Sequence, residues 1–113
     1  YDCTCMHEFV MSLEKFHKEN NVSALDVAKA LLDFGIHPPT MYFPLIVSEA
    51  LMVEPTETES RETLDDAIAA FRKIYDSIIS SPASVSASPV TTPMRRLDEV
   101  KAAREPVLKY EFS

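Results

Sequence analysis

The sequence has a single glycine, Gly35, two cysteines and no tryptophan. One glycine is too few for the glycine-rich backbone cradles that bind cofactor phosphates. Cys3 and Cys5 stand two positions apart. In a strand their side chains would project from one face about 6 to 7 Å apart, too far for an unstrained disulfide. We therefore expect two free thiols, which fits a reducing, cytoplasmic compartment.

Long apolar runs are also absent, so we predict neither a membrane span nor a secretory signal. The 18 acidic residues outnumber the 11 basic ones, for a net charge of -7. This balance argues against a nucleic-acid partner, because phosphate contacts require a basic surface. The length of 113 residues, 46% of them apolar, predicts one soluble domain. Because the chain starts at Tyr1 rather than Met, we expect it to belong to a longer polypeptide.

Hydrophobic spacing predicts an α+β fold, with a small antiparallel sheet and helices on one face. Strand-like segments run over residues 3–11 and 50–54, and residues 14–21 look like a polar turn or link. A sheet of two strands is rarely stable alone. We expect the missing strand to come from the tail or from upstream of Tyr1.

Capping signals predict two helices. Ser23 and Asp26 have capping-box spacing before a helix over residues 24–34, which Gly35 would end in the left-handed conformation. Thr56 and Glu59 repeat that spacing before a second helix. Its apolar stripe would consist of Leu64, Ile68, Phe71, Tyr75 and Ile78.

Composition divides the chain into three parts. Residues 1–79 would form the α+β core. Residues 80–93 are rich in Ser and Pro and lack charged and aromatic residues, so we expect a linker or surface loop without a packed element. Residues 94–113 would be a tail that packs back on the domain or on a neighbouring one. The tail suggests a charged helix around residues 98–104 and a strand-like stretch at 107–112.

Cysteine and histidine near the N-terminus invite two chemical readings. Cys3, Cys5 and His7 could lie on one strand face as zinc ligands, but they lack a tight C-x2-C turn and a fourth ligand, so we predict no metal site. Cys5 could also act as a nucleophile, yet no oxyanion loop or third group is evident. His37 lies in the proline-rich stretch 36–44, where it could present its imidazole to a cleft or stand idle in solvent.

The acidic junction after residue 53 also has two readings. Glu54, Thr56 and Glu57 precede the second predicted helix, so their ordinary role would be to cap it. A strand-to-helix junction also displays carboxylates and backbone N–H groups at one sheet edge, where a substrate or partner could meet them. Sequence alone leaves both readings open.

Four blocks, in this order, resemble one enzyme family. They are MHEFV at 6–10, ALDVAKALLDFGIHPPT at 24–40, LMVEPTETE at 51–59 and RRLDEVKAAREP at 95–106. Together they are similar to the C-terminal region of decarboxylating glycine dehydrogenase, the P-protein of the glycine cleavage system. The chain's ending resembles the second subunit of the two-subunit bacterial form.

The resemblance implies the small domain of a fold-type I pyridoxal phosphate enzyme. Such an enzyme decarboxylates glycine and passes the aminomethyl group to the lipoyl arm of the H-protein. Its Schiff-base lysine belongs to the large domain, outside this chain, and the lysines present here occupy polar or terminal positions. We therefore expect no catalytic residue and no bound cofactor in this chain. The implied partners are the rest of the P-protein, including its other subunit, and the lipoylated H-protein.

Candidate site residues follow from the same resemblance. His37, Pro39 and Thr40 match the family's loop, and Glu54, Thr56 and Glu57 match its strand-to-helix junction. We predict that His37, Thr40 and the junction residues line the active-site cleft. Two alternatives remain: a stand-alone interaction or ligand-sensing module, and a small thiol enzyme that uses Cys5.

Overall fold

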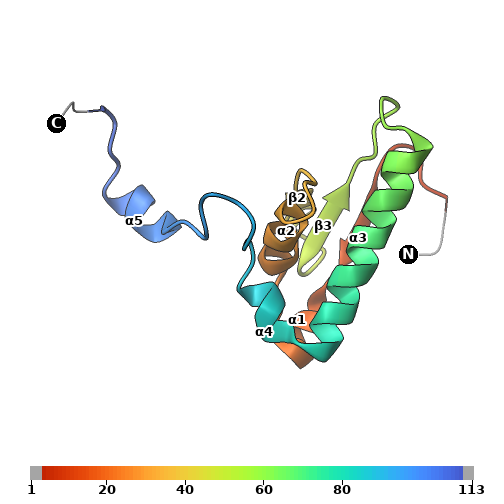
Figure 1. Ribbon diagram of the computed structural model, residues 1–113, viewed down its shortest axis with the longest axis horizontal. Helices are drawn as coiled ribbons and strands as arrows, with labels where there is room; N and C mark the ends of the chain where they lie inside the picture. Colours follow the sequence, from red (N-terminus) through yellow and green to blue (C-terminus); the bar gives the residue numbers. More distant parts are fainter. Residues whose placement is uncertain (1–3, 111–113) are drawn as a thin grey trace.

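The computed structural model describes residues 4–110, and its ribbon is drawn in Figure 1. Its elements are, in chain order, β1 (Phe9–Ser12), α1 (Glu14–Asn20), α2 (Ala24–Leu32), β2 (Thr40–Met41), β3 (Ala50–Val53), α3 (Arg61–Ser80), α4 (Pro82–Ser86) and α5 (Glu99–Arg104). The predicted α+β class with a small antiparallel sheet is confirmed. None of the helices in the described part is both long and apolar enough to cross a bilayer.

Within residues 4–110 the sheet has three strands in the order β1-β3-β2, all antiparallel. Leu51 of the central strand pairs with Met11 on one side and Met41 on the other. The third strand was expected from the tail or from upstream of Tyr1, and that expectation was wrong. It is β2, which lies inside the proline-rich stretch. Two residues suffice because an edge strand pairs on one side only.

The first strand is shorter than predicted. It begins at Phe9, so Cys5 and His7 lie before it and are exposed. The predicted face of Cys3, Cys5 and His7 on one strand is therefore not formed for the latter two, and Cys3 lies outside the described residues. Cys5 is a free thiol.

The segment 14–21 was predicted as an irregular link, and this was wrong because it forms α1. The helix ends at Asn20 and is followed by Asn21, which adopts the left-handed conformation with φ 56°. Phe16 packs against the core and meets the Tyr75 ring edge to face, with 5.7 Å between ring centroids. One apolar residue among charged neighbours was too weak a periodic signal to predict this helix.

The second helix forms as its capping signals indicated. The Ser23 hydroxyl accepts from the Asp26 N–H, and the Asp26 carboxylate accepts from the Ser23 N–H at 2.8 Å, so the capping box is complete. The helix ends at Leu32, two residues before the predicted end. Gly35 follows in the left-handed conformation, with φ 71°. Local hydrogen bonding thus sets the start of α2.

The long helix α3 begins later than predicted. Its N-cap is Ser60, whose hydroxyl accepts from the Thr63 N–H at 3.1 Å. Thr56 instead shares a 2.8 Å hydrogen bond with the Thr58 hydroxyl, so the capping box assigned to Thr56 and Glu59 was wrong. The buried stripe also differs from the expectation. It runs through Ala70, Ile74 and Ile78, while Ile68 and Tyr75 are about half exposed.

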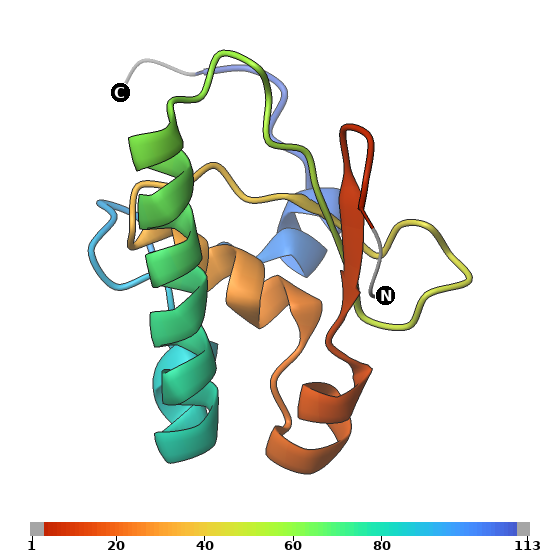
Figure 2. The ribbon, with the colours of Figure 1, turned by 90° about the vertical axis from the view of Figure 1, so that its right-hand side faces the viewer.

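The core collects side chains from most of these elements. Its buried members are Leu13, Val22, Ala24, Val27, Ala28, Ala30, Leu31, Leu51, Ile74, Ile78 and Val85. Helices α1 and α4 lie beside the C-terminal end of α3 in both views, and both contact it (Figure 1 and Figure 2). The core therefore sits among α2, α3, α4 and the central strand.

The Ser- and Pro-rich stretch 80–93 contains a packed element, so the expectation of none was wrong. It forms α4, which places Val85 in the core, and both Ser88 and Pro89 are buried. Small, uncharged side chains allow this close packing against α2 and α3. Sequence composition did not reveal it, because the apolar contacts come from distant parts of the chain.

The tail divides at Arg96. The predicted charged helix is α5, capped by Asp98, whose carboxylate accepts from the Lys101 N–H at 2.8 Å. Residues 107–110 form no strand, and the rest of the predicted strand-like stretch lies outside the described residues. Figure 1 shows α5 standing away from the body of the domain.

Candidate functional site

A groove of about 970 Å³ runs between α3 and the sheet. One wall is the loop 34–40, the other is the N-terminal half of α3, and the end of β3 with the following residues closes the third side. Residues 34–40 enter it because the chain turns after α2 at the left-handed Gly35 and the prolines that follow keep it extended up to β2. The groove is thus built where three separate segments converge.

Four of the five predicted site residues line this groove. His37 and Thr40 come from the loop, and Glu54 and Thr56 come from the junction after β3. Glu57 does not line it, so the structure brings together four residues and leaves the fifth outside. All four are exposed to solvent. The imidazole of His37 and the carboxylate of Glu54 make no hydrogen bond or ion pair with any residue of the described range 4–110.

Further polar groups in the groove were missed by sequence reasoning. Asp66 and Lys73 project from α3, and Glu59 adds a third charge at its start. Asp66 and Lys73 are seven positions apart, about two helical turns, so their spacing predicts a shared face. That spacing was the available signal. Lys73 Nζ lies 5.9 Å from the centroid of the Phe34 ring, across the groove wall.

The groove combines an apolar lining with an acidic rim. Ile36, Met52 and Phe71 supply apolar surface, while Glu54, Glu59 and Asp66 are opposed by Lys73 alone among its lysine and arginine side chains. Such a surface suits a partner or substrate that is partly apolar and carries positive charge. No group of three or more His, Cys, Asp or Glu side chains in residues 4–110 is placed to hold a metal ion.

The described residues do not fit pyridoxal phosphate. The cofactor needs a lysine for its Schiff base and backbone N–H groups around its phosphate. None of the lysines in residues 4–110 is buried. At Gly35, the chain's one glycine, an added Cβ would meet nothing within 4 Å, so this glycine leaves no tight cradle for a phosphate.

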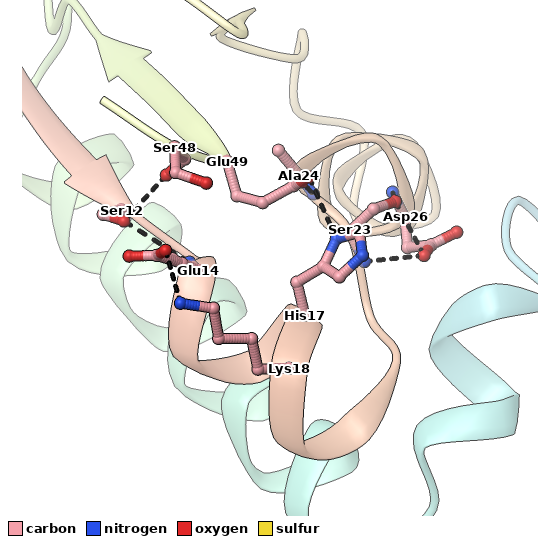
Figure 3. A network of polar contacts seen from close by, with 9 residues as sticks. All are labelled: Ser12, Glu14, His17, Lys18, Ser23, Ala24, Asp26, Ser48 and Glu49. Atoms are coloured by element: carbon pink, nitrogen blue, oxygen red, sulfur yellow. Dashed lines mark hydrogen bonds and ion pairs between the residues drawn. The ribbon is translucent and has the colours of Figure 1, made fainter. Parts of the chain in front are cut away.

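A second polar cluster, drawn in Figure 3, lies at the N-terminal end of α2, whereas the groove begins beyond its C-terminal end. Glu49, just before β3, has one carboxylate oxygen 2.9 Å from His17 Nδ1, and the other accepts from the Ala24 N–H at 2.7 Å. Nearby, the Ser12 hydroxyl donates to the Ser48 carbonyl at 2.8 Å. One oxygen of the Glu49 carboxylate thus contacts α1 and the other contacts the first residue of α2, so this cluster holds both helices to the start of β3.

Two aspartates tie the segment after α4 to α2. Arg96 Nη2 lies 2.7 Å from Asp26 Oδ1, and the Asp33 carboxylate accepts from the N–H groups of Val90 and Thr91 at 2.7 and 2.8 Å. Burial raises the pKa of Asp26, but the Ser23 hydrogen bonds and Arg96 outweigh it and lower the pKa overall. At Asp33 too, burial raises the pKa and the bonds from Thr91, Val90 and Ser88 lower it overall.

Comparison of the sequence with known proteins places this chain in a family. Residues 2–94 match the model described as "Glycine dehydrogenase, C-terminal domain". Over 98% of its length the chain is 56% identical to "Probable glycine dehydrogenase (decarboxylating) subunit 2" of Fervidobacterium nodosum and 59% identical to the protein of that name from Treponema denticola. It covers 23% of each of those two relatives. A third protein of that name, from Bacillus velezensis, is 57% identical over 98% of the chain and is covered to 22%.

The chain thus spans less than a quarter of the length of these relatives. The family model ends at Met94, two residues before the Arg96 contact that holds the tail to the body. From its matched residues, the chain belongs to the family of glycine dehydrogenase C-terminal domains.

Proposed function

We propose that this chain is the small C-terminal domain of a decarboxylating glycine dehydrogenase and that its groove faces the cleft where glycine reacts. The supporting observation is the convergence of His37, Thr40, Glu54 and Thr56 on one groove, from segments on either side of β3. The alignment over 98% of the chain with proteins named glycine dehydrogenase subunit 2 supports the choice of reaction.

In this proposal the chain contributes surface and does no covalent chemistry. Pyridoxal phosphate would be bound by the rest of the polypeptide, where it serves as the electron sink for glycine decarboxylation. His37 and Glu54 would hydrogen-bond or orient groups at the cleft entrance, since both side chains are exposed and without an internal partner among residues 4–110. The apolar part of the lining would exclude water from the entrance.

We also infer the partners and location of the whole protein. The relatives' name, subunit 2, supports a second subunit as one partner. The lipoylated H-protein would be the acceptor of the aminomethyl group. An exposed free thiol at Cys5 agrees with a cytoplasmic location, where thiols stay reduced.

The test uses the complete enzyme with both subunits. Glycine-dependent exchange of CO2 measures the reaction, and borohydride reduction traps the cofactor on its lysine. We expect activity in the wild type and a fall in kcat/KM of about tenfold for His37→Gln and for Glu54→Gln, as for loss of a hydrogen bond to the reacting complex. Glu62→Gln is the matched control, because Glu62 is exposed on α3 and does not line the groove.

Two results would count against the proposal. If the complete wild-type enzyme showed no glycine-dependent exchange, the assigned reaction would be wrong, and a stand-alone interaction module would become the better explanation. If His37→Gln and Glu54→Gln behaved like Glu62→Gln, the reaction could stand but the groove would not face the cleft.

A further inference from the structure

The charges of the groove are divided between its two ends. Glu54 and Glu59 lie in the junction before α3, and Asp66 follows in the first half of that helix. Lys73 stands further along α3, beside Phe34, with 5.9 Å from its Nζ to the ring centroid. Within residues 4–110 no ion pair joins Lys73 to any of these carboxylates. The groove is therefore acidic at the junction and basic at Phe34.

Asp66 and Lys73 set the distance between the two ends. They are seven residues apart on α3, which is about 10 Å along the helix axis. Ala70 lies between them on the same side of the helix and adds only a methyl group to the groove wall. A molecule that satisfies both charges must therefore carry a cationic group and an anionic group about 10 Å apart, with apolar surface between them.

Glycine itself is too small for this arrangement. Its ammonium nitrogen and its carboxylate carbon are less than about 3 Å apart. One glycine molecule fills on the order of 100 Å³, whereas the groove measures about 970 Å³. An extended polypeptide segment rises about 3.3 Å per residue, so about three residues span the distance between the two charges. The size and the charges of the groove thus favour a segment of polypeptide.

The rim of the groove is typical of a contact with a partner that binds and leaves. Glu54, Glu59, Asp66 and Lys73 are all exposed to solvent. Permanent interfaces between subunits resemble a hydrophobic core cut in half, whereas charged rims suit transient partners. Among the molecules that the proposed reaction requires, the other subunit would be permanent and glycine is too small. The acceptor protein is the macromolecule that must arrive, react and leave.

We propose that the groove binds an extended segment of the lipoylated H-protein and that Asp66 and Lys73 fix the direction of this segment. A basic side chain of the segment lies at Asp66, and a carboxylate of the segment lies at Lys73. This inference rests on the proposed function, because the H-protein is a partner only if the enzyme is a glycine dehydrogenase. Helix α3 then orients the incoming protein, while His37 and Glu54 act at the cleft entrance.

The test is the dissociation constant of lipoylated H-protein for the complete two-subunit enzyme, measured by titration calorimetry. Asp66→Lys and Lys73→Glu should each weaken binding at least about tenfold, because each brings like charges together. The double variant Asp66→Lys/Lys73→Glu keeps the net charge of the wild type but reverses the polarity of the groove. It should bind no better than either single variant, because a segment within a folded protein cannot turn round. Lys73→Arg keeps the cation and should bind like the wild type.

Arg72→Glu and Asp76→Lys are the matched controls. They make the same changes of charge at exposed positions of α3 that do not line the groove. Both should bind the H-protein within about threefold of the wild type, because salt screens exposed charges that lie outside a contact. The melting temperature of each variant shows whether it is folded.

Three results would overturn the proposal. The first is equal affinity of the wild type and the two single groove variants, and the second is an equal loss in the groove variants and the controls. The third is a wild-type enzyme that does not bind the H-protein. A double variant that regained wild-type affinity would contradict the assigned direction. If one single variant did not fold, the other would decide, because each tests one end of the contact.

Failure of the proposed function would look different. Binding does not require turnover, so the titration can be read in an enzyme without glycine-dependent CO2 exchange. Binding that depends on Asp66 and Lys73 in such an inactive enzyme would retain the docking groove and remove the assigned reaction. An active enzyme whose affinity for the H-protein does not depend on these two residues would retain the reaction and remove the docking groove.

Discussion

The carboxylate of Glu49 accepts a 2.7 Å hydrogen bond from the backbone N–H of Ala24, twenty-five residues earlier in the chain. Ala24 is the first residue of α2, and its N–H has no partner within the helix. The same carboxylate lies 2.9 Å from His17 Nδ1 in α1. Glu49 itself has a positive φ of 49°, directly before β3. One acidic side chain thus connects the central strand with two helices.

Replacing Glu49 by Ala should lower the free energy of unfolding by about 1–3 kcal/mol, because the partly buried Ala24 N–H would lose its acceptor. Glu49→Gln keeps an oxygen acceptor and should cost less than Glu49→Ala. Urea unfolding followed by circular dichroism measures both. Glu57→Ala is the control, since Glu57 is exposed and should change stability by no more than about 0.5 kcal/mol. Equal stability of Glu49→Ala and Glu57→Ala would refute this role.

The lowered pKa of Asp26 predicts a loss of stability in acid. Its pKa in the folded chain lies below the usual value of an aspartate, so the unfolded chain binds the proton more readily. The stabilisation is therefore complete above about pH 4 and disappears as the pH falls through the folded pKa. Asp33 acts in the same direction. We expect the melting temperature of the wild type to fall steadily from pH 4 towards pH 2.

Asp26→Asn isolates this contribution. The variant should be less stable than the wild type at pH 7, where the ion pair with Arg96 is intact, and the difference should shrink below pH 4. Thermal unfolding at both pH values gives the two differences. A stability difference that is the same at pH 7 and pH 3 would show that the Asp26 charge contributes nothing.

The two proposed caps of α3 can be told apart by paired substitutions. Ser60→Ala should cost about 1 kcal/mol, because the Ser60 hydroxyl accepts from the Thr63 N–H. Thr56→Ala should cost less than about 0.5 kcal/mol, because within residues 4–110 the Thr56 hydroxyl bonds only with the exposed Thr58 hydroxyl. The reverse order of these two losses in urea unfolding would restore the cap that sequence spacing alone suggested.

Gly35 offers a test of backbone conformation without steric interference. Its φ is 71°, and an added Cβ would meet no atom within 4 Å. Gly35→Ala should therefore destabilise the chain by about 1–2 kcal/mol through the left-handed backbone alone. Gly35→Asn should be milder, because asparagine tolerates that conformation better. Equal losses for Ala and Asn would mean that something other than φ requires glycine here.

Sequence reasoning succeeded where the signal was local. The capping box of Ser23 and Asp26, the left-handed Gly35 and the capped helix after Asp98 each depend on residues within one or two turns. It failed where the partner is distant. Strand β2 exists because Thr40 and Met41 pair with β3, and α4 is held by Val85 packing into a core made by other elements. The amino-acid composition around β2 and α4 did not indicate either contact.

The site shows the same division. His37, Thr40, Glu54 and Thr56 could be named from family blocks, and all four line the groove. Their convergence depends on how the loop 34–40 crosses towards β3, which no local pattern specifies. Asp66 and Lys73 were missed for that reason, although their spacing of seven was visible. Glu57 was included because it matches the family's strand-to-helix junction, but it lies in the turn that follows Thr56 and does not line the groove.

The stretch between α3 and Arg96, which Asp26 and Asp33 hold to α2, determines where trypsin should cut the protein. Between Lys73 and Arg95 the sequence contains no lysine or arginine, so trypsin has no site in the last part of α3, in α4 or in the segment that follows. Its exposed sites resume at Arg95 and Arg96 and continue at Lys101 and Arg104 in α5. Brief digestion should remove the part of the tail that carries α5 first and leave α4 attached. A stable crystallisation fragment should accordingly keep residues up to 96, whereas one ended at residue 79 would lose Val85 from its interior.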